Sequence, residues 1–280
     1  MPGIAFPFAT AYRSRPMKRR TFLQSSVAQA VAGSAALAAL SNAASAADGK
    51  AREYYKLSTY TLNAAKKPVL DTYLGKAFIP ALRRAGIGPV GVFSETLPDG
   101  KLAVYVLIVL KSPDEAATLS SHLAADADYK NAAADYLAAP ASDPVYDRIE
   151  SSFLGAIEGF PHLAKPDTTK ARLLNLRIYE SHNERAALKK IEMFNEHELA
   201  IFKRVGLTPV LFGEALGGAK MPNLTYLLVF PDDDARKAAW KSFGGDDAWK
   251  QLKAVPEYAD KEIVSHITNK LLTPEPYSEI

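Results

Sequence analysis

Hydrophobic and polar residues follow the same succession of patterns twice along the chain. Each succession begins with alternation at period two, which is typical of a half-buried strand, and continues with a helical pattern that a glycine closes. The strand patterns cover residues 53–61 and 172–180, the helical patterns cover 69–85 and 185–205, and the glycines are Gly86 and Gly206. The second succession therefore begins 119 residues after the first.

Two more strands, a second helix with acids at its start and a last strand complete each succession. The strands are expected at 90–95, 102–110 and 147–154, and again at 210–215, 224–230 and 261–269. This order of elements is ferredoxin-like. We therefore predict an α+β fold in which tandem ferredoxin-like repeats form an intramolecular pseudo-dimer, a dimeric α+β barrel. The first unit is placed at 51–159, the linker at 160–169 and the second unit at 170–275.

Matched residues support a duplication, because they recur at nearly constant spacing. Gly86 matches Gly206, Tyr60 matches Tyr179 and Tyr105 matches Tyr226, at offsets of 120, 119 and 121 residues. Residues 54–60, 78–82 and 86–93 of the first unit, and 202–210 of the second, also resemble the NIPSNAP family. That resemblance implies the α+β barrel fold over most of residues 51–275. It implies no reaction, because the family has no settled one.

The first 46 residues read as an export signal. They hold five Lys and Arg and no acid, and Arg19-Arg20 precedes an apolar stretch that ends in Ala44-Ser45-Ala46. This arrangement resembles a twin-arginine signal, so we expect cleavage near Ala46, a periplasmic or secreted protein and no stable membrane insertion afterwards. An uncleaved anchor is the alternative, and Met17 is an alternative start.

Removing the signal changes what the charge indicates. The full chain of 280 residues has a net charge of +3, whereas the chain after residue 46 has a net charge of −2. No dense cluster of Lys and Arg remains, so we expect no nucleic-acid partner. The chain has no cysteine, which excludes a disulfide scaffold and a cysteine nucleophile.

Glu198 is the most informative single residue. It lies within the apolar stripe of the second long helix, at the position that Phe78 occupies in the first unit. A carboxylate on an apolar face is costly unless it is paired or protonated, and such groups often serve function. Two interpretations stay open: a structural, hydrogen-bonded carboxylate, or a functional one.

The polar faces of the strands suggest a ligand site. If the apolar faces meet the helices, the polar faces line the barrel interior. The expected lining residues are Lys56, Ser58, Tyr60, Tyr105, Arg177, Tyr179 and Tyr226. Such a lining suits a small polar or anionic ligand with Arg177 as the clamp. A filled interior without a cavity is the alternative.

The sequence contains no metal or cofactor motif, so we expect neither group. Related barrels hold haem through one histidine, which leaves His182 and His266 as candidates for a test. Three function classes follow: a module that binds a small ligand, an interaction module that forms homo-oligomers through a sheet face, and an oxygenase or peroxidase-like enzyme that is cofactor-independent or haem-dependent.

Overall fold

The computed structural model describes residues 51–280 of the chain. The predicted signal, with Arg19, Arg20 and the cleavage position near Ala46, lies outside the described residues. Residues 51–280 belong to one compact unit, which begins at Gly49. None of the helices in this described part is both long and apolar enough to cross a bilayer.

The first half runs from β1 to β4 and follows the predicted order. Its strands are β1 (Tyr54–Asn63), β2 (Val90–Thr96), β3 (Lys101–Leu110) and β4 (Arg148–Ala156). Its helical elements are η1 (Ala64–Lys66), α2 (Lys67–Thr72), η2 (Tyr73–Phe78), α3 (Ile79–Arg84), α4 (Pro113–Ala125), α5 (Ala127–Ala132) and α6 (Ala134–Leu137). The long predicted helix is thus α2 and α3 joined by η2, a π-helical segment.

The second half has the same order of strands and a matching π-helical segment. Its strands are β5 (Leu173–Glu180), β6 (Thr208–Gly217), β7 (Asn223–Phe230) and β8 (His266–Pro274). Its helical elements are α7 (Glu184–Met193), η3 (Phe194–Glu198), α8 (Leu199–Val205), α9 (Asp233–Gly245), α10 (Asp247–Leu252), η4 (Pro256–Tyr258) and α11 (Asp260–Ile263). Gly206 closes α8 in the left-handed conformation, at a φ of 82°.

The last strand begins later than the sequence analysis expected. Residues 260–263 form α11, and the strand starts only at His266. Ile263, the last residue of this short helix, is buried. The short helix α11, with Ile263 as its buried residue, therefore replaces the first part of the expected strand.

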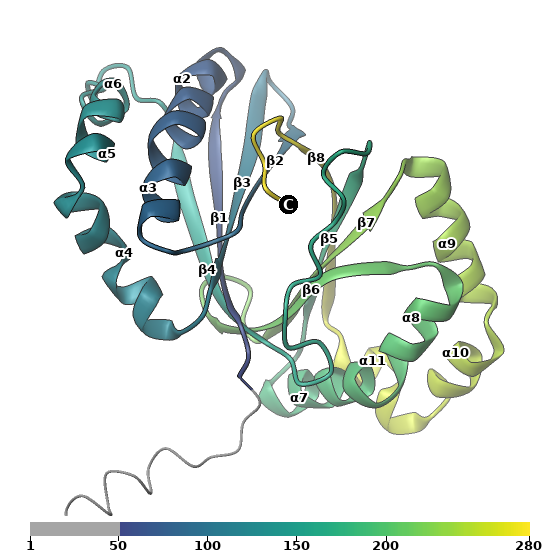
Figure 1. Ribbon diagram of the computed structural model, residues 1–280. Coiled ribbons are helices and arrows are strands. Elements are labelled where there is room, and N and C mark those ends of the chain that lie inside the picture. Colours follow the sequence, from purple (N-terminus) through teal and green to yellow (C-terminus); the bar gives the residue numbers. More distant parts are fainter. Residues whose placement is uncertain (1–50) are drawn as a thin grey trace, which may run out of the picture. The chain divides into compact units, whose positions relative to one another are not determined.

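The eight strands close into one antiparallel barrel, in the order β1-β3-β2-β8-β5-β7-β6-β4. Within each half the strand order is ferredoxin-like, and the halves meet where β2 pairs with β8 and β4 pairs with β6. Figure 1 shows α2 to α6 on the side of the first half and α7 to α11 on the side of the second. The α+β barrel class predicted from the sequence is confirmed.

The segment that follows the last strand of each half crosses to the other half. After β8, Glu275 N–H donates to the Val92 carbonyl over 2.8 Å and Glu279 N–H donates to the Val90 carbonyl over 3.0 Å. The Ile280 side chain is fully buried among the residues of the barrel core. After β4, Ala164 N–H donates to Val210 of the second half over 2.9 Å.

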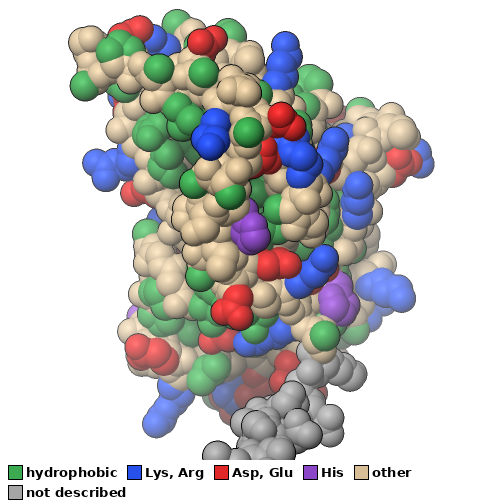
Figure 2. Space-filling view, turned by 60° about the vertical axis from the view of Figure 1, so that its left-hand side comes forward, with side chains coloured by type: hydrophobic (Ala, Val, Ile, Leu, Met, Phe, Trp, Pro, Cys, Tyr) green, Lys and Arg blue, Asp and Glu red, His purple; other side chains and the backbone are tan. Residues whose placement is uncertain are grey.

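Three apolar cores result, one inside the barrel and one between the sheet and the helices of each half. Positive and negative side chains are interspersed on the face shown in Figure 2. The sheet–helix layers bury polar groups such as Ser58, Lys190 and Glu198.

Candidate functional site

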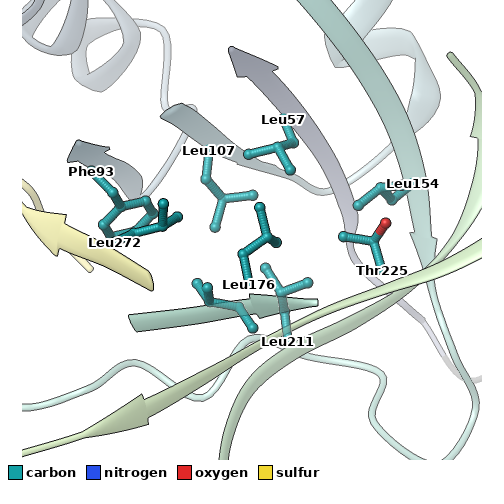
Figure 3. A pocket seen from close by; sticks show the side chains of 9 residues that line it. Leu57, Phe93, Leu107, Leu154, Leu176, Leu211, Thr225 and Leu272 are labelled. Atoms are coloured by element: carbon teal, nitrogen blue, oxygen red, sulfur yellow. The ribbon is translucent and has the colours of Figure 1, made fainter. Parts of the chain in front are cut away.

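The barrel interior is filled by apolar side chains. Figure 3 shows them converging from strands of both halves. The lining residues are Leu57, Phe93, Leu107, Leu154, Leu176, Leu211, Thr225, Leu227 and Leu272. They leave a cavity of only about 10 Å³, which is near the space that one water molecule requires. The interior therefore holds no chamber for a small ligand.

Most of the expected lining residues lie on the other face of the strands. Lys56, Ser58, Tyr60, Arg177, Tyr179 and Tyr226 all point away from the barrel interior, as the buried clusters and strand registers show. The prediction that the polar faces of the strands line the barrel interior was wrong. A narrow barrel fills with apolar side chains because unpaired polar groups are costly there, whereas the helices offer partners to polar groups on the outer face.

Tyr105 is the expected residue that does lie on the inner face. Its hydroxyl donates to Glu95 over 3.0 Å, and Lys270 of the second half pairs with the same carboxylate over 3.0 Å. Tyr105 pairs in register with Thr59, whereas Tyr226 pairs with Arg177. The match of Tyr105 with Tyr226 was therefore wrong by one residue, which moves a side chain to the opposite face.

The outer layer of the first half is rich in phenols. Ser58 forms a hydrogen bond of 2.8 Å with Ser151. A group of tyrosines packs behind it, comprising Tyr60, Tyr73, Tyr129, Tyr136 and Tyr146. Burial raises the pKa of the Tyr60 hydroxyl to about 12. The Tyr60 hydroxyl therefore stays protonated at physiological pH.

The outer layer of the second half holds Arg177. Its Nη2 donates to the Tyr179 hydroxyl over 3.1 Å, and its guanidinium carbon lies 4.5 Å from the ring centre of Trp240 on α9. The Tyr226 hydroxyl also donates to the Tyr179 oxygen, over 2.8 Å. The Arg177 Nε is buried without an acceptor, and no carboxylate of residues 51–280 forms a salt bridge with this side chain. Arg177 is thus a half-buried cation without a counter-ion among the described residues.

Glu198 lies in the same layer, at the end of η3, and is 2% exposed. It pairs with Lys190 of α7, whose Nζ lies 2.9 Å from a carboxylate oxygen and which is 1% exposed. Burial raises the pKa of Glu198, and the charge of Lys190 opposes that rise. Three aromatic rings surround the ammonium group, those of Phe194, Tyr179 and Trp249.

Sequence reasoning missed Lys190 and the role of Trp240. Lys190 lies four residues before Phe194 and eight before Glu198, so helical spacing could have placed it on the same stripe. Nothing in the sequence linked Trp240 to Arg177, because their contact depends on how α9 packs over β5.

The histidines do not gather into a site. All five are exposed, including His182 and His266, so their positions give no support to a haem ligand. Within the described part of the chain, no group of three or more histidine or acidic side chains is placed to hold a metal ion. The outer layer of the second half instead holds the buried Lys190–Glu198 ion pair and the Arg177 guanidinium group, whose Nε has no acceptor.

Comparison with known families identifies a domain in the second half. The NIPSNAP family model matches residues 174–279, which include Arg177, Lys190 and Glu198. Residues 174–279 are therefore similar to the NIPSNAP family. That the first half is a second copy of the same unit stays a prediction. No curated protein matches the chain.

Solved structures share the fold. A candidate monooxygenase from Fusobacterium nucleatum superposes with a TM-score of 0.51 at 11% identity, covering 81% of this chain and 94% of its own. Another from Lactobacillus acidophilus gives 0.52 at 10% identity, with coverages of 80% and 94%. A NIPSNAP family protein of unknown function from Agrobacterium tumefaciens covers 39% of this chain and 92% of its own, at 16% identity and a TM-score of 0.34. The first two likenesses support the barrel fold.

Proposed function

We propose that the chain is an exported binding protein whose second half holds a small oxyanion at Arg177. The observation that carries this proposal is the state of the guanidinium group. It is half-buried, its Nε–H has no acceptor, and no described carboxylate neutralises it. A carboxylate or phosphate group is the natural complement of such a side chain, because it accepts from the planar guanidinium in charge-assisted hydrogen bonds.

The neighbours of Arg177 also favour an acceptor-only ligand. The Tyr179 oxygen receives hydrogen bonds from both Arg177 and Tyr226, which occupies its capacity to accept. Lys190 is neutralised by Glu198, so the positive charge of Arg177 remains unbalanced in the layer. Donors and positive charge are in surplus, and an oxyanion would satisfy both.

The surroundings of Arg177 limit how a ligand can approach. Trp240 lies over the guanidinium group, so a ligand would have to contact the edge of that group. Asn269 is the register partner of Arg177 on β8 and is exposed. Its Oδ1 accepts from Asn175 Nδ2 over 2.6 Å, which leaves its own amide N–H groups free to donate to a ligand.

The first half does not repeat this site. Ser58 and Val106 occupy the register positions of Arg177 and Tyr226. A serine and a valine supply no charge, so we expect one oxyanion for each chain.

Calorimetric titration with benzoate, acetate and inorganic phosphate tests the proposal. We expect one site per chain and at least tenfold weaker binding after Arg177→Gln, a loss of about 1.4 kcal/mol. Arg52→Gln is the matched control, because Arg52 lies 5.7 Å from the Tyr54 ring centre in the first half. Equal affinity of Arg177→Gln and the parent chain, or no binding of any of the three anions, would reject the oxyanion site.

An oxygenase, whether cofactor-independent or haem-dependent, is the alternative function. It has less support, because the buried Lys190 and Glu198 are enclosed by side chains and the barrel interior is filled. An enzyme of this kind needs titratable groups in an open pocket.

A further inference from the structure

The fold does not require the charges of Lys190 and Glu198. At the offset of 120 residues, their counterparts in the first half are Leu70 and Phe78, both buried. Phe78 and Glu198 each end a π-helical segment, so the two positions are also equivalent in the structure. Apolar residues therefore suffice at these positions, and the charged pair in the second half requires another explanation.

The pair lies in the same layer as Arg177 and beside the same phenol ring, that of Tyr179. The Arg177 guanidinium carbon and the Lys190 Nζ each lie 5.3 Å from the ring centre of Tyr179. Lys190 and Glu198 are almost fully buried, so little water screens the charges that act on them.

Several charged or titratable groups act on Glu198 from the elements packed around it. They are Lys190 on α7, Arg177 on β5, Tyr226 on β7 and Asp260 at the start of α11. Burial raises the pKa of Glu198, while the positive charges of Lys190 and Arg177 lower it. The charge of Arg177 is thus one of the influences on the ionisation of Glu198, and the smallest of them.

We propose that binding of an oxyanion at Arg177 is coupled to uptake of a proton by Glu198, so that the site binds its ligand more tightly as the pH falls. This inference rests on the proposed function. A bound anion cancels the positive field that favours the carboxylate form of Glu198. The proton comes from solvent, and the neutral carboxyl group keeps its hydrogen bond with Lys190.

The sign of the effect follows from linkage. Binding raises the pKa of Glu198, so binding takes up a proton only between the pKa of the free protein and the higher pKa of the complex. Within that window the affinity rises by up to about tenfold for each unit of falling pH, the limit for one linked proton. Outside the window the affinity is independent of pH.

The test is calorimetry of benzoate binding to the full chain between about pH 5.5 and 8, where the ligand stays ionised. Measurements in buffers with different ionisation enthalpies give the number of protons taken up. We expect uptake that reaches up to about one proton within the window for the parent chain. Glu198→Gln and the apolar pair Lys190→Met with Glu198→Leu should bind benzoate without uptake, because they keep Arg177 and lose the titrating group.

The outcomes separate the inference from the function on which it rests. Benzoate binding by the parent chain without proton uptake at any pH, or uptake that persists in both variants, overturns the coupling and leaves the oxyanion site standing. Absence of benzoate binding to the parent chain overturns both. The double variant is an independent measurement of proton uptake, because it replaces the charged pair by apolar residues like those of the first half.

Discussion

The buried Lys190–Glu198 pair is the sharpest contrast between the halves of the chain. Two charges that are 1% and 2% exposed lose nearly all their hydration, and their mutual attraction offsets only part of that cost. Leu70 and Phe78 avoid this cost at the equivalent positions. At the scale of single residues, the second half therefore carries a charged pair that costs stability, where the first half carries an apolar contact.

Substitution of the pair should reveal that cost. Lys190→Met alone leaves Glu198 as an unpaired buried carboxylate and should lower the free energy of unfolding by about 3–5 kcal/mol. The additional change Glu198→Leu should recover most of this loss or exceed the parent stability, because no buried charge then remains. Denaturant unfolding measures both variants. A double variant no more stable than Lys190→Met would show that the pair itself stabilises the layer.

At the scale of the strand, alternation along the sequence located the strands but not the direction of their faces. Leu174 and Leu176 were expected to meet the helices, yet they lie inside the barrel. Both sides of strands such as β3 and β7 are buried in this fold, so the usual rule of one apolar and one solvated face does not apply to them. Arg177 and Tyr179 find partners under the helices, and those partners come from segments far away in the sequence.

A glycine shows how closely β2 is packed at the barrel core. A Cβ at Gly91 would lie 2.5 Å from Phe93 Cζ and 3.3 Å from the Ile280 Cβ. Both neighbours are buried and have little room to shift, so Gly91→Ala should lower the free energy of unfolding by about 1–3 kcal/mol.

Gly244→Ala is the matched control, because nothing lies within 4 Å of the added Cβ in the exposed end of α9. Alanine there should stabilise the chain by up to about 1 kcal/mol, since glycine loses more backbone freedom in a helix. Thermal and denaturant unfolding measure the two variants side by side. Equal effects of the two changes would contradict the close packing at Gly91.

At the scale of the whole molecule, the sequence predicted the order of strands within each half and missed how the halves join. The β2–β8 junction pairs only two residues of each strand, Phe93 and Ser94 with Pro274 and Thr273. No local pattern predicts such a pairing between strands of the two halves. The crossing of residues 275–280 onto the first half was likewise not predictable, because it depends on contacts with Val90 and Val92 that form only in the closed barrel.

The expected export would also act on the whole molecule, because the twin-arginine route carries folded proteins. Arg19→Lys with Arg20→Lys should block transport and leave the full-length precursor inside a bacterium that has this route. The parent chain should appear outside the cytoplasm with a mass that corresponds to a start just after Ala46. Secretion of the twin-lysine variant at the parent level would contradict the twin-arginine assignment.

The crossing of the last segment has a consequence for the order of events during synthesis. β2 and the barrel core of the first half are covered by residues 266–280, which leave the ribosome long after β2 does. Until then β2 presents an unpaired edge, which invites pairing with other chains. Closure of the barrel therefore has to wait until residues 266–280 have been synthesised, and a chaperone would protect the nascent first half during that delay.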